Sequence, residues 1–585
     1  MIVNVIHRPA WGKQYEMFRL QQSMAHELGL KVTVLVPYDF LFDEKIVADI
    51  QEDNRQYGDE IGIWFGEIAT KRMNEVFCCK EPFLWLHTKE NKRRLITEVL
   101  RQFQEAFHTL PEAVGCYHMD AYSMALLREL CPRIKVSIAG CFEEGVKVFH
   151  GCNHSWYLFN EGMPWWPWYP AKNNTLRPAR DEEDWAGIVA VPHLCRDLAL
   201  SYEGRNDFFA SHPSNIQRAM ANEGAVAPYV LNLLDVHRFQ ERYNDGFSYT
   251  NVFVGPNWLS GSANVQDSDE ITQGLYREYL EYFAALRQEG KLQDMHLSEF
   301  AGWYREHMPM GRSQVFDAKE MLYGSGKEYF WYLDPSMRVT VDPCQGGSIG
   351  DLRPFVAAQE RCPGADMPQK EMASNPYLIH SQYRTGNAHH YEDGARTTLL
   401  VSHKGQTLDL ADYPVKVADI ARRQEKTTLT LTPAKLKFQD GLTLWLQTVY
   451  TFQNSGDILM ERLITECSDP AESVEMTEYV KGCYGTTEYP EPMQGIRLEL
   501  QEESGTQSLE FHYTGESISS ECARQVSAEI PALETQISLR ADGDAPRRAQ
   551  AQEGVLFNPY YTLKLEGTGS LGKGVSTWLT LRKKK

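Results

Sequence analysis

The sequence predicts an α/β domain followed by an all-β domain. A (β/α)7–8 barrel of the TIM type is expected over residues 1–310, a helical linker over 311–335, and an antiparallel β-sandwich over 336–585. In the first part, short runs of Val, Ile and Leu alternate with helical patterns, as in parallel strands joined by crossover helices. In the second part, apolar and polar residues nearly alternate, which is typical of antiparallel strands with one wet face.

Length and composition agree with this division. The chain has 585 residues, 42% hydrophobic and 24% charged, so it is too long for one hydrophobic core and ordinary for a folded protein. Two or three domains are therefore expected.

The barrel strands are predicted from apolar runs and the helices from amphipathic patterns. The expected strands are 3–6, 32–37, 61–63, 114–117, 136–139, 188–192, 229–234 and the run around 295–297. The clearest helices are 15–28, 92–107, 122–130 and 270–288. Seven or eight such units fit one barrel. In the second part the expected strands include 338–341, 397–401, 429–431, 442–452 and 576–581.

Charge and targeting signals limit the partners. The net charge of −20 disfavours nucleic acid and anionic lipid. No apolar run approaches the ~20 residues that a membrane span needs, and no secretory signal precedes the apolar residues 2–6. A cytoplasmic protein with reduced thiols is expected, because the 12 cysteines are scattered.

Acids, histidines and tryptophans follow the predicted strands, which is where barrels of this type collect their chemistry. Asp120 follows the fourth strand, and either it acts as a catalytic carboxylate or it caps the next helix. His118 lies two residues earlier and could adjust that acid or bind a hydroxyl, unless it is a structural histidine. Glu143 and Glu144 follow the fifth strand, and at most one of these adjacent acids is expected to reach the pocket.

Later strands offer weaker candidates. Asp235 follows the run 229–234, and Glu299 follows the last run, although Glu299 also suits the first turn of a helix. At the first strand, His7 and Arg8 could orient a hydroxyl or bind an anionic sugar group, and a salt bridge of Arg8 within the barrel is the alternative.

Aromatic residues are concentrated in the segment 149–170, where tryptophans are interspersed with prolines. Such a segment cannot form a regular helix, and its rings could stack on sugar faces. The expected binding residues here are Asn153, His154, Trp165 and Trp166, with Trp64 from the third strand, and core packing of the rings is the alternative. His150 and His154 are four apart, but Gly151 and Asn153 between them argue against a helical zinc pair.

Two segments carry a family resemblance. Residues 26–36 (HELGLKVTVLV) and 58–64 (GDEIGIW) resemble the helix–strand signature and the GHEIGxH motif of the polysaccharide deacetylase superfamily and its sugar-cleaving relatives, glycoside hydrolase families 57 and 38. The resemblance implies a barrel over about 1–310. Those deacetylases bind a metal with an aspartate after the first strand and two histidines four apart. Here the corresponding positions hold His7-Arg8-Pro9, Trp64 and Ile68, so no metal is expected.

His7-Arg8-Pro9 instead resembles the His-Gln-Pro motif of glycoside hydrolase family 57, with Arg8 in place of Gln. That resemblance implies two catalytic carboxylates, on the fourth and seventh strands, and strand order would place them at Asp120 and Asp235. Residues 438–452 are similar to the mutarotase-like super-sandwich that follows many catalytic barrels.

The expected function is therefore hydrolysis of glycosidic bonds in oligosaccharides or glycan ends, by a carboxylate pair and without a cofactor. The expected partner is a carbohydrate, and self-association into a homo-oligomer is left open. One alternative is a deacetylase-like hydrolase with a rebuilt metal site of His118, Asp120, His150 and His154. Another is a carbohydrate-binding protein without catalysis.

Overall fold

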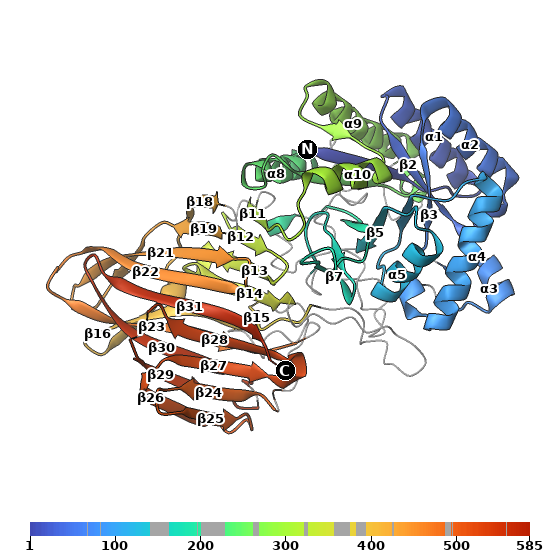
Figure 1. Ribbon diagram of the computed structural model, residues 1–585. Helices are drawn as coiled ribbons and strands as arrows, with labels where there is room; N and C mark the ends of the chain where they lie inside the picture. The colour runs from blue at the N-terminus through green and yellow to red at the C-terminus, as the bar shows by residue number, and fades with distance from the viewer. Residues whose placement is uncertain are drawn as a thin grey trace. The chain divides into compact units, whose positions relative to one another are not determined.

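The computed structural model in Figure 1 describes most of the chain. Outside the described part lie residues 67, 82, 141–162, 196, 200–227, 261–267, 321–325, 356–374, 382–393, 424–425, 486–492, 494, 544, 557 and 585. The chain divides into two compact units. The first comprises Met1–Asp197, Asn206–Gly311 and Gln359–Ser374, and the second Leu198–Arg205, Arg312–Ala358 and Asn375–Lys585.

The first unit is built on a curved parallel sheet. Its strands are β1 (Ile2–His7), β2 (Val32–Pro37), β3 (Glu60–Trp64), β4 (Ala113–Gly115), β5 (Val136–Gly140), β8 (Val189–Pro192), β9 (Tyr249–Phe253) and β10 (Gln293–Asp294). They run in the order β9-β1-β2-β3-β4-β5-β8, with β10 beside the first residues of β1, and every pairing is parallel. Most of these strand residues are buried, as expected of a sheet covered on both faces.

Side chains connect the two edges of this sheet. The Asn251 side chain on β9 donates a hydrogen bond to the Pro192 carbonyl at the end of β8, over 2.6 Å. The parallel barrel-like domain and the antiparallel β-domain that follows it confirm the predicted fold class. The barrel is an open half-barrel.

Helices follow the strands and cover the outside of the sheet (Figure 1). They are α1 (Lys13–Glu27), α2 (Glu44–Tyr57), α3 (Lys71–Phe77), α4 (Lys89–Phe107), α5 (Ala121–Leu130), α8 (Pro228–Phe239), α9 (Asp269–Gln288) and α10 (Leu297–His307). Short polar residues cap their amino ends as expected: the Thr88 hydroxyl accepts from the backbone N–H of Asn91 at α4. The four helices predicted most clearly are confirmed within three residues at each end.

Two predicted strands are corrected. Residues 229–234 belong to helix α8, which begins at Pro228, a residue favoured at the first helical position. The strand that follows in the sheet is β9, which had not been predicted. At the last run the strand β10 ends at Asp294, and residue 297 already begins α10.

The second unit consists of three antiparallel sheets. The first contains β11 (Gln314–Lys319), β12 (Glu328–Leu333), β13 (Met337–Asp342), β14 (Ser348–Pro354) and β15 (Ile379–His380). The second contains β16 (Arg396–His403), β17 (Gln406–Asp409), β23 (Ser473–Gly482), β26 (Ser517–Ala523), β29 (Arg547–Gln552) and β30 (Tyr561–Ser570). The third contains β18 (Val417–Arg423), β19 (Lys426–Leu431), β20 (Ala434–Lys437), β21 (Thr443–Gln453), β22 (Asp457–Cys467), β24 (Arg497–Gln501), β25 (Thr506–Glu510), β27 (Gln525–Ile530), β28 (Thr535–Ala541) and β31 (Gly574–Lys583).

The second and third sheets pack against each other, with β30 in contact with β22, β27, β28 and β31. Burial alternates residue by residue along β21, as expected when one strand face lines a core. Part of the predicted helical linker 311–335 forms strands β11 and β12 instead, so the helix predicted there is wrong. Its residues 328–333 are all buried and rich in aromatic side chains, which favours a strand.

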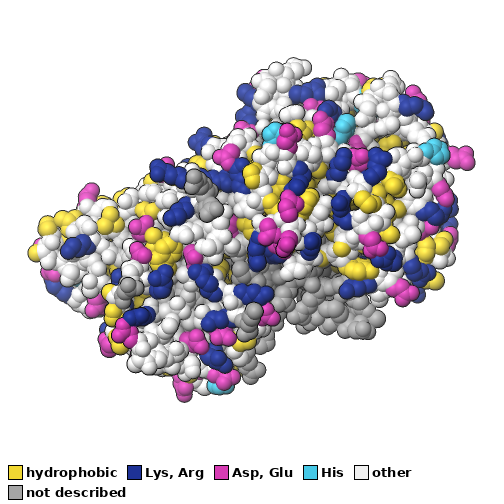
Figure 2. Space-filling model, in the orientation of Figure 1, with side chains coloured by type: hydrophobic (Ala, Val, Ile, Leu, Met, Phe, Trp, Pro, Cys, Tyr) yellow, Lys and Arg dark blue, Asp and Glu magenta, His cyan; other side chains and the backbone are white. Residues whose placement is uncertain are grey.

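Among the described residues, no helix combines the length and apolarity that crossing a bilayer requires. On the face shown in Figure 2, basic and acidic side chains are interspersed. The cysteines in the described part are free thiols, five of them buried.

Candidate functional site

Five side chains from five strands converge at the carboxyl ends of the half-barrel. Arg8 follows β1, Trp64 ends β3, Tyr117 lies two residues past β4, His193 follows β8, and Phe253 ends β9. We call these five residues the mouth cluster. Parallel strands place their carboxyl ends at one edge of the sheet, so residues far apart in sequence meet there.

The rings of the mouth cluster contact one another edge to face. The Trp64 ring centroid lies 5.1 Å from those of Tyr117 and Phe253, at interplanar angles of 89° and 84°. The His193 ring lies 4.8 Å from Phe253 and 5.3 Å from Tyr117. The Arg8 guanidinium carbon is 5.4 Å from the Trp64 ring and 5.7 Å from the Phe253 ring, within cation–π range of both.

Glycines make the space for Trp64. A Cβ atom on Gly115 of β4 would lie 2.8 Å from Trp64 Cε3, and one on Gly66 would collide with the same ring. A Cβ atom on Gly62 would lie 2.5 Å from the Ala113 carbonyl oxygen. Glycine at positions 66 and 115 therefore leaves room for the indole, and glycine at position 62 lets β3 lie close to the backbone of β4.

Buried polar side chains lie in and beside the mouth cluster. Trp64 is 2% exposed, and its indole N–H has no hydrogen-bond partner among the described residues. His118 is fully buried beside the backbone of Ala139, and its ring lies 5.8 Å from that of Trp85. Burial lowers the pKa of His118 to about 4, so this imidazole is neutral at pH 7. Unpaired buried donors and acceptors favour a ligand or water that pairs with them.

Asp39 had not been chosen from the sequence, although it follows β2 at the same edge of the sheet. Asp39 is 7% exposed, and within the described part of the chain its Oδ1 has no hydrogen-bond partner. Oδ2 accepts a long bond of 3.5 Å from the backbone N–H of Arg72. A signal for it was available, since Asp39 is the first acid after the second apolar run.

The sequence allowed two roles for Asp120, a catalytic carboxylate or a helix cap, and the structure shows it as a helix cap. It caps α5, because Oδ1 accepts from the backbone N–H of Ser123 at 3.0 Å and Oδ2 from its hydroxyl at 2.6 Å. The Lys92 ammonium lies 2.8 Å from Oδ1, and both side chains are buried. Burial by itself would raise the pKa of Asp120, and the contacts with Lys92 and Ser123 bring it below its ordinary value.

Asp235 and Glu299 lie away from the mouth cluster. Asp235 is on helix α8, 46% exposed, and pairs with Arg238 at 2.6 Å, one turn later. Glu299 is in the first turn of α10, where its carboxylate accepts from the backbone N–H of His296. It also pairs with Lys31, which precedes β2, so Glu299 lies at the amino ends of the strands, opposite the mouth cluster.

His7 and Arg8 point to opposite faces of β1, as consecutive strand residues do. The His7 ring is fully buried against helices, with Nδ1 bonded to the Gln22 side chain of α1 and Nε2 2.8 Å from the Tyr276 hydroxyl of α9. Burial lowers the pKa of His7 to about 4 despite the bond with Gln22. His7 is therefore a core residue, and only Arg8 belongs to the mouth cluster.

The described part of the tryptophan-rich segment is packed into the core. Trp165 and Trp166 are at most 1% exposed, and the Trp166 indole N–H donates to His237 Nδ1 at 2.9 Å. This burial agrees with the packing role that had been the alternative for these two rings. The predicted residues Glu143, Glu144, Asn153 and His154 lie outside the described residues.

The donor set does not fit the divalent metal of the deacetylases. Trp64 occupies a position where those enzymes have a histidine, and the Arg8 guanidinium lies over its ring. Neither group ligates a divalent cation, and a fixed positive charge there repels one. The alternative metal site consists of His118, Asp120, His150 and His154. Of these residues, Asp120 is paired with Lys92, and His150 and His154 lie outside the described residues.

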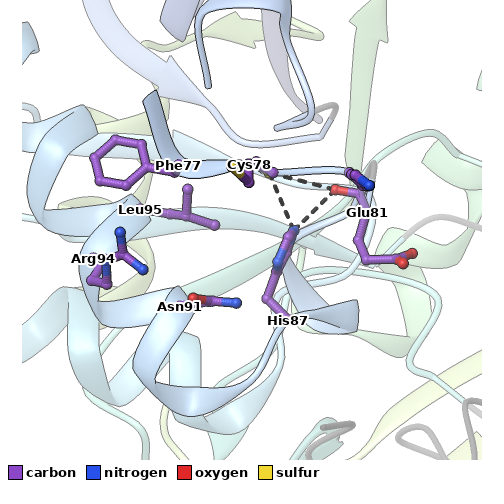
Figure 3. A pocket seen from close by; sticks show the side chains of 9 residues that line it. Phe77, Cys78, Glu81, His87, Asn91, Arg94 and Leu95 are labelled. Carbon is purple, nitrogen blue, oxygen red and sulfur yellow. Dashed lines mark hydrogen bonds between the residues drawn. The ribbon is translucent and has the colours of Figure 1, made fainter. Parts of the chain in front are cut away.

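A separate pocket of about 200 Å³ lies between α3 and α4 (Figure 3). Its inner wall is Cys79, whose Sγ lies 3.5 Å from His87 Nε2, and the same nitrogen lies 2.9 Å from the Glu81 carbonyl oxygen. Burial raises the pKa of the Cys79 thiol to about 11 and lowers the pKa of His87. Both groups are neutral at pH 7, so this pair is not an activated thiolate.

Comparisons with solved structures give distant likenesses of fold. A protein of Parabacteroides distasonis, provisionally described as a glycoside hydrolase/deacetylase, matches at 13% identity and a TM-score of 0.45, over 64% of this chain and 88% of that one. The 4-alpha-glucanotransferase of Thermococcus litoralis matches at 10% identity and a TM-score of 0.30, over 100% of this chain and 99% of the other. A galactose mutarotase-like protein of Clostridium acetobutylicum matches at 10% identity and a TM-score of 0.29, over 46% of this chain and 98% of the other.

These matches are distant likenesses of fold, at 10–13% sequence identity. No curated protein matches the sequence. A family model matches residues 18–327, which is more than half of the 585-residue chain. The protein therefore belongs to the family of that model, the domain of unknown function DUF3863, for which a solved structure exists.

Proposed function

We propose that this protein is a glycoside hydrolase that binds a sugar at the mouth cluster and cleaves a glycosidic bond with two carboxylates and no metal ion. The observation that carries the proposal is the convergence of Trp64, Tyr117 and Phe253 with Arg8 and His193 at the carboxyl ends of five parallel strands. Sugar rings present C–H faces that pack on aromatic planes and hydroxyls that need polar partners.

The catalytic carboxylates are proposed to be drawn from Asp39, Glu143 and Glu144. Asp39 follows β2, and its buried Oδ1 has no hydrogen-bond partner among the described residues. Glu143 and Glu144 come three and four residues after the end of β5, whose carboxyl end is at the same edge. Glycoside hydrolysis needs one carboxyl group as acid and a second as nucleophile or base.

The test is turnover of a panel of aryl glycosides and reduced oligosaccharides by protein treated with a chelator. Asp39→Asn, Glu143→Gln and Glu144→Gln are measured beside Asp235→Asn, which alters an exposed acid outside the mouth cluster. We expect loss of two of the three carboxylates to lower kcat about 100-fold or more each, while Asp235→Asn leaves it unchanged. Unchanged activity in all three variants contradicts the proposal.

A second candidate is a carbohydrate-binding protein without catalysis. It is favoured by the engagement of Asp120, one of the predicted catalytic acids, with Lys92 and with the first turn of α5. It predicts that no glycoside is turned over and that the carboxylate variants bind oligosaccharides as tightly as the parent protein.

A further inference from the structure

We infer that Trp11 is a stacking platform for a second sugar unit, so that the substrate is an oligosaccharide that extends from the mouth cluster onto this ring. The inference rests on the proposed function for the place of the first sugar unit. It adds a residue that selects the length of the sugar chain, and this residue lies outside the mouth cluster.

The exposure of Trp11 is the first observation. Of the tryptophans in the described part of the chain, only Trp11 is exposed, at 50%. Its ring stacks on that of Phe40, with the centroids 3.9 Å apart and an interplanar angle of 19°. Phe40 is 9% exposed, so it covers one face of the indole from the protein side. The opposite face of the indole is therefore presented to solvent.

The stacked pair is held from two sides. Phe40 belongs to η1, the short 3-10 helix Tyr38–Phe42 that directly follows β2. At the start of η1 the Tyr38 hydroxyl donates a hydrogen bond to the Glu98 carboxylate of α4, over 2.8 Å. On the other side Gly12 directly follows the tryptophan with φ 61° and ψ −137°, a backbone conformation that suits glycine, and α1 begins at the next residue. A ring fixed in advance loses little entropy when a ligand stacks on it.

The position of the platform in the fold favours a sugar as its ligand. Trp11 and the mouth-cluster residue Arg8 lie on the same short loop between β1 and α1, at the carboxyl edge of the sheet. Phe40 directly follows Asp39, a proposed catalytic acid whose buried Oδ1 has no hydrogen-bond partner among the described residues. A sugar chain bound at the mouth cluster can therefore lay its next unit on the indole, because the C–H faces of sugar rings pack on aromatic planes.

A second stacked pair supplies a matched control. The Tyr57 ring is 49% exposed and stacks on the His26 ring, with the centroids 3.7 Å apart and an interplanar angle of 12°. Tyr57 ends α2 and precedes β3, so it lies at the amino ends of the strands, opposite the mouth cluster. The two pairs are alike in exposure and geometry and differ in the edge of the sheet that they occupy. Tyr57→Ala is therefore the control for Trp11→Ala.

The experiment measures binding by calorimetry, so that it does not depend on turnover. The probes are linear oligosaccharides of glucose, mannose, xylose and N-acetylglucosamine, from one to four units long, as methyl glycosides. We expect the affinity in at least one series to rise about tenfold or more when the second unit is added, the gain expected for one well-packed tryptophan. Trp11→Ala should remove this gain and leave the binding of a single unit unchanged. Trp11→Phe should keep part of the gain, and Tyr57→Ala should keep all of it.

Fluorine NMR of the parent protein labelled with fluorotryptophan observes the platform directly. The Trp11 signal is the one that is missing in Trp11→Phe. We expect this signal to shift when the two-unit glycoside binds and to stay in place when the one-unit glycoside binds. Sedimentation of the parent protein and of Trp11→Ala examines the other use of an exposed ring, which is contact between two copies of the chain.

The outcomes separate this inference from the proposed function. Loss of the second-unit gain in Trp11→Ala, together with turnover of an oligosaccharide, supports both. The same loss without any turnover supports the platform and rejects the hydrolase. Unchanged binding in Trp11→Ala, an equal loss in Tyr57→Ala, or a dimer that Trp11→Ala dissociates overturns the platform, and oligosaccharide turnover then leaves the hydrolase standing. Failure of every probe to bind overturns both.

Discussion

The carboxylate of Asp120 illustrates how one residue can suit two roles until its partners are known. Its position after a strand fits a catalytic acid, and its position before a helix fits a cap. The sequence cannot distinguish these roles, because the deciding partner, Lys92, is 28 residues away on α4. The ion pair is buried, so its two members stabilise the fold only together.

Asp120→Asn is expected to destabilise the protein by about 3–5 kcal/mol, since it removes the carboxylate that lies 2.8 Å from the buried Lys92 ammonium. Asparagine also caps helices well, so the loss of unfolding free energy measures the broken ion pair rather than a lost helix cap. The measurement is urea unfolding at pH 7. Asp120→Asn combined with Lys92→Met should recover part of the loss, and a single variant as stable as the parent would contradict the pairing.

Gly115 gives a second residue-scale prediction, on the mouth cluster. Gly115→Ala places a methyl group where Trp64 Cε3 and Leu35 Cδ1 already lie, 2.8 and 2.9 Å away. We expect the Trp64 ring to shift, with a change in tryptophan fluorescence and at least tenfold weaker sugar binding. The fold should lose about 1–3 kcal/mol of stability through overpacking.

Gly274→Ala is the matched control, because no atom lies within 4 Å of the added methyl group on α9. It should leave fluorescence and binding unchanged, and it should stabilise the helix slightly. Unchanged sugar binding in Gly115→Ala would show that the position of Trp64 does not matter for the ligand.

At the scale of elements, α10 gives Glu299 a structural role. It lies in the first turn, where its carboxylate meets the free backbone N–H at the helix start and the ammonium of Lys31. Glu299→Gln should cost no more than about 1 kcal/mol, because a glutamine at this position can still accept the capping bond and the ion pair is exposed. Thermal unfolding measures this loss, and glycoside turnover should stay at the level of the parent protein.

The sequence was sufficient for most parallel strands, since each is a short apolar run followed by polar residues. It failed at residues 229–234, where a short apolar run fits a helix or a strand equally well. The neighbouring β9 was missed because Thr250 and Asn251 interrupt its apolar pattern. Asn251 is polar for a structural reason, since its side chain bonds to β8 across the open edge of the sheet.

The buried tryptophans show a second limit. Trp165 and Trp166 have a composition typical of a sugar-binding loop, but the same large rings also fill cores efficiently. The hydrogen bond from the Trp166 indole to His237 on α8 indicates that this ring belongs to the core. That contact joins residues 71 positions apart, and no local pattern predicts it.

At the scale of the whole molecule, the candidate site exists only because distant strands share one edge. Strand ends predicted from the sequence gave Arg8 and Trp64, but not their neighbours Tyr117 and Phe253. The pleat of β1 then separates Arg8, in the mouth cluster, from His7, which faces α1. A shift of one residue in that strand would exchange the two roles, so the site depends on register as much as on composition.

His7 and His118, both fully buried, make the stability of the first unit depend on pH. Each has a pKa lowered from 6.5 to about 4, chiefly by burial. Between these values the unfolded chain binds a proton that the folded chain does not, so the folded state loses stability as the pH falls from 6.5 towards 4. Each histidine accounts for about 3 kcal/mol at most, at 1.36 kcal/mol per pKa unit.

Urea unfolding of the parent protein and of His118→Leu at pH 7.0, 5.5 and 4.5 tests this dependence. Leucine fills most of the imidazole volume and cannot take up a proton. Asp120 beside it also loses its ion pair at low pH, but that carboxylate is present in both proteins. The variant should therefore show a smaller loss of unfolding free energy between pH 7.0 and 4.5, by about 1–3 kcal/mol. An equal loss in both proteins would mean that His118 is protonated at its ordinary pKa, in a cavity that admits water.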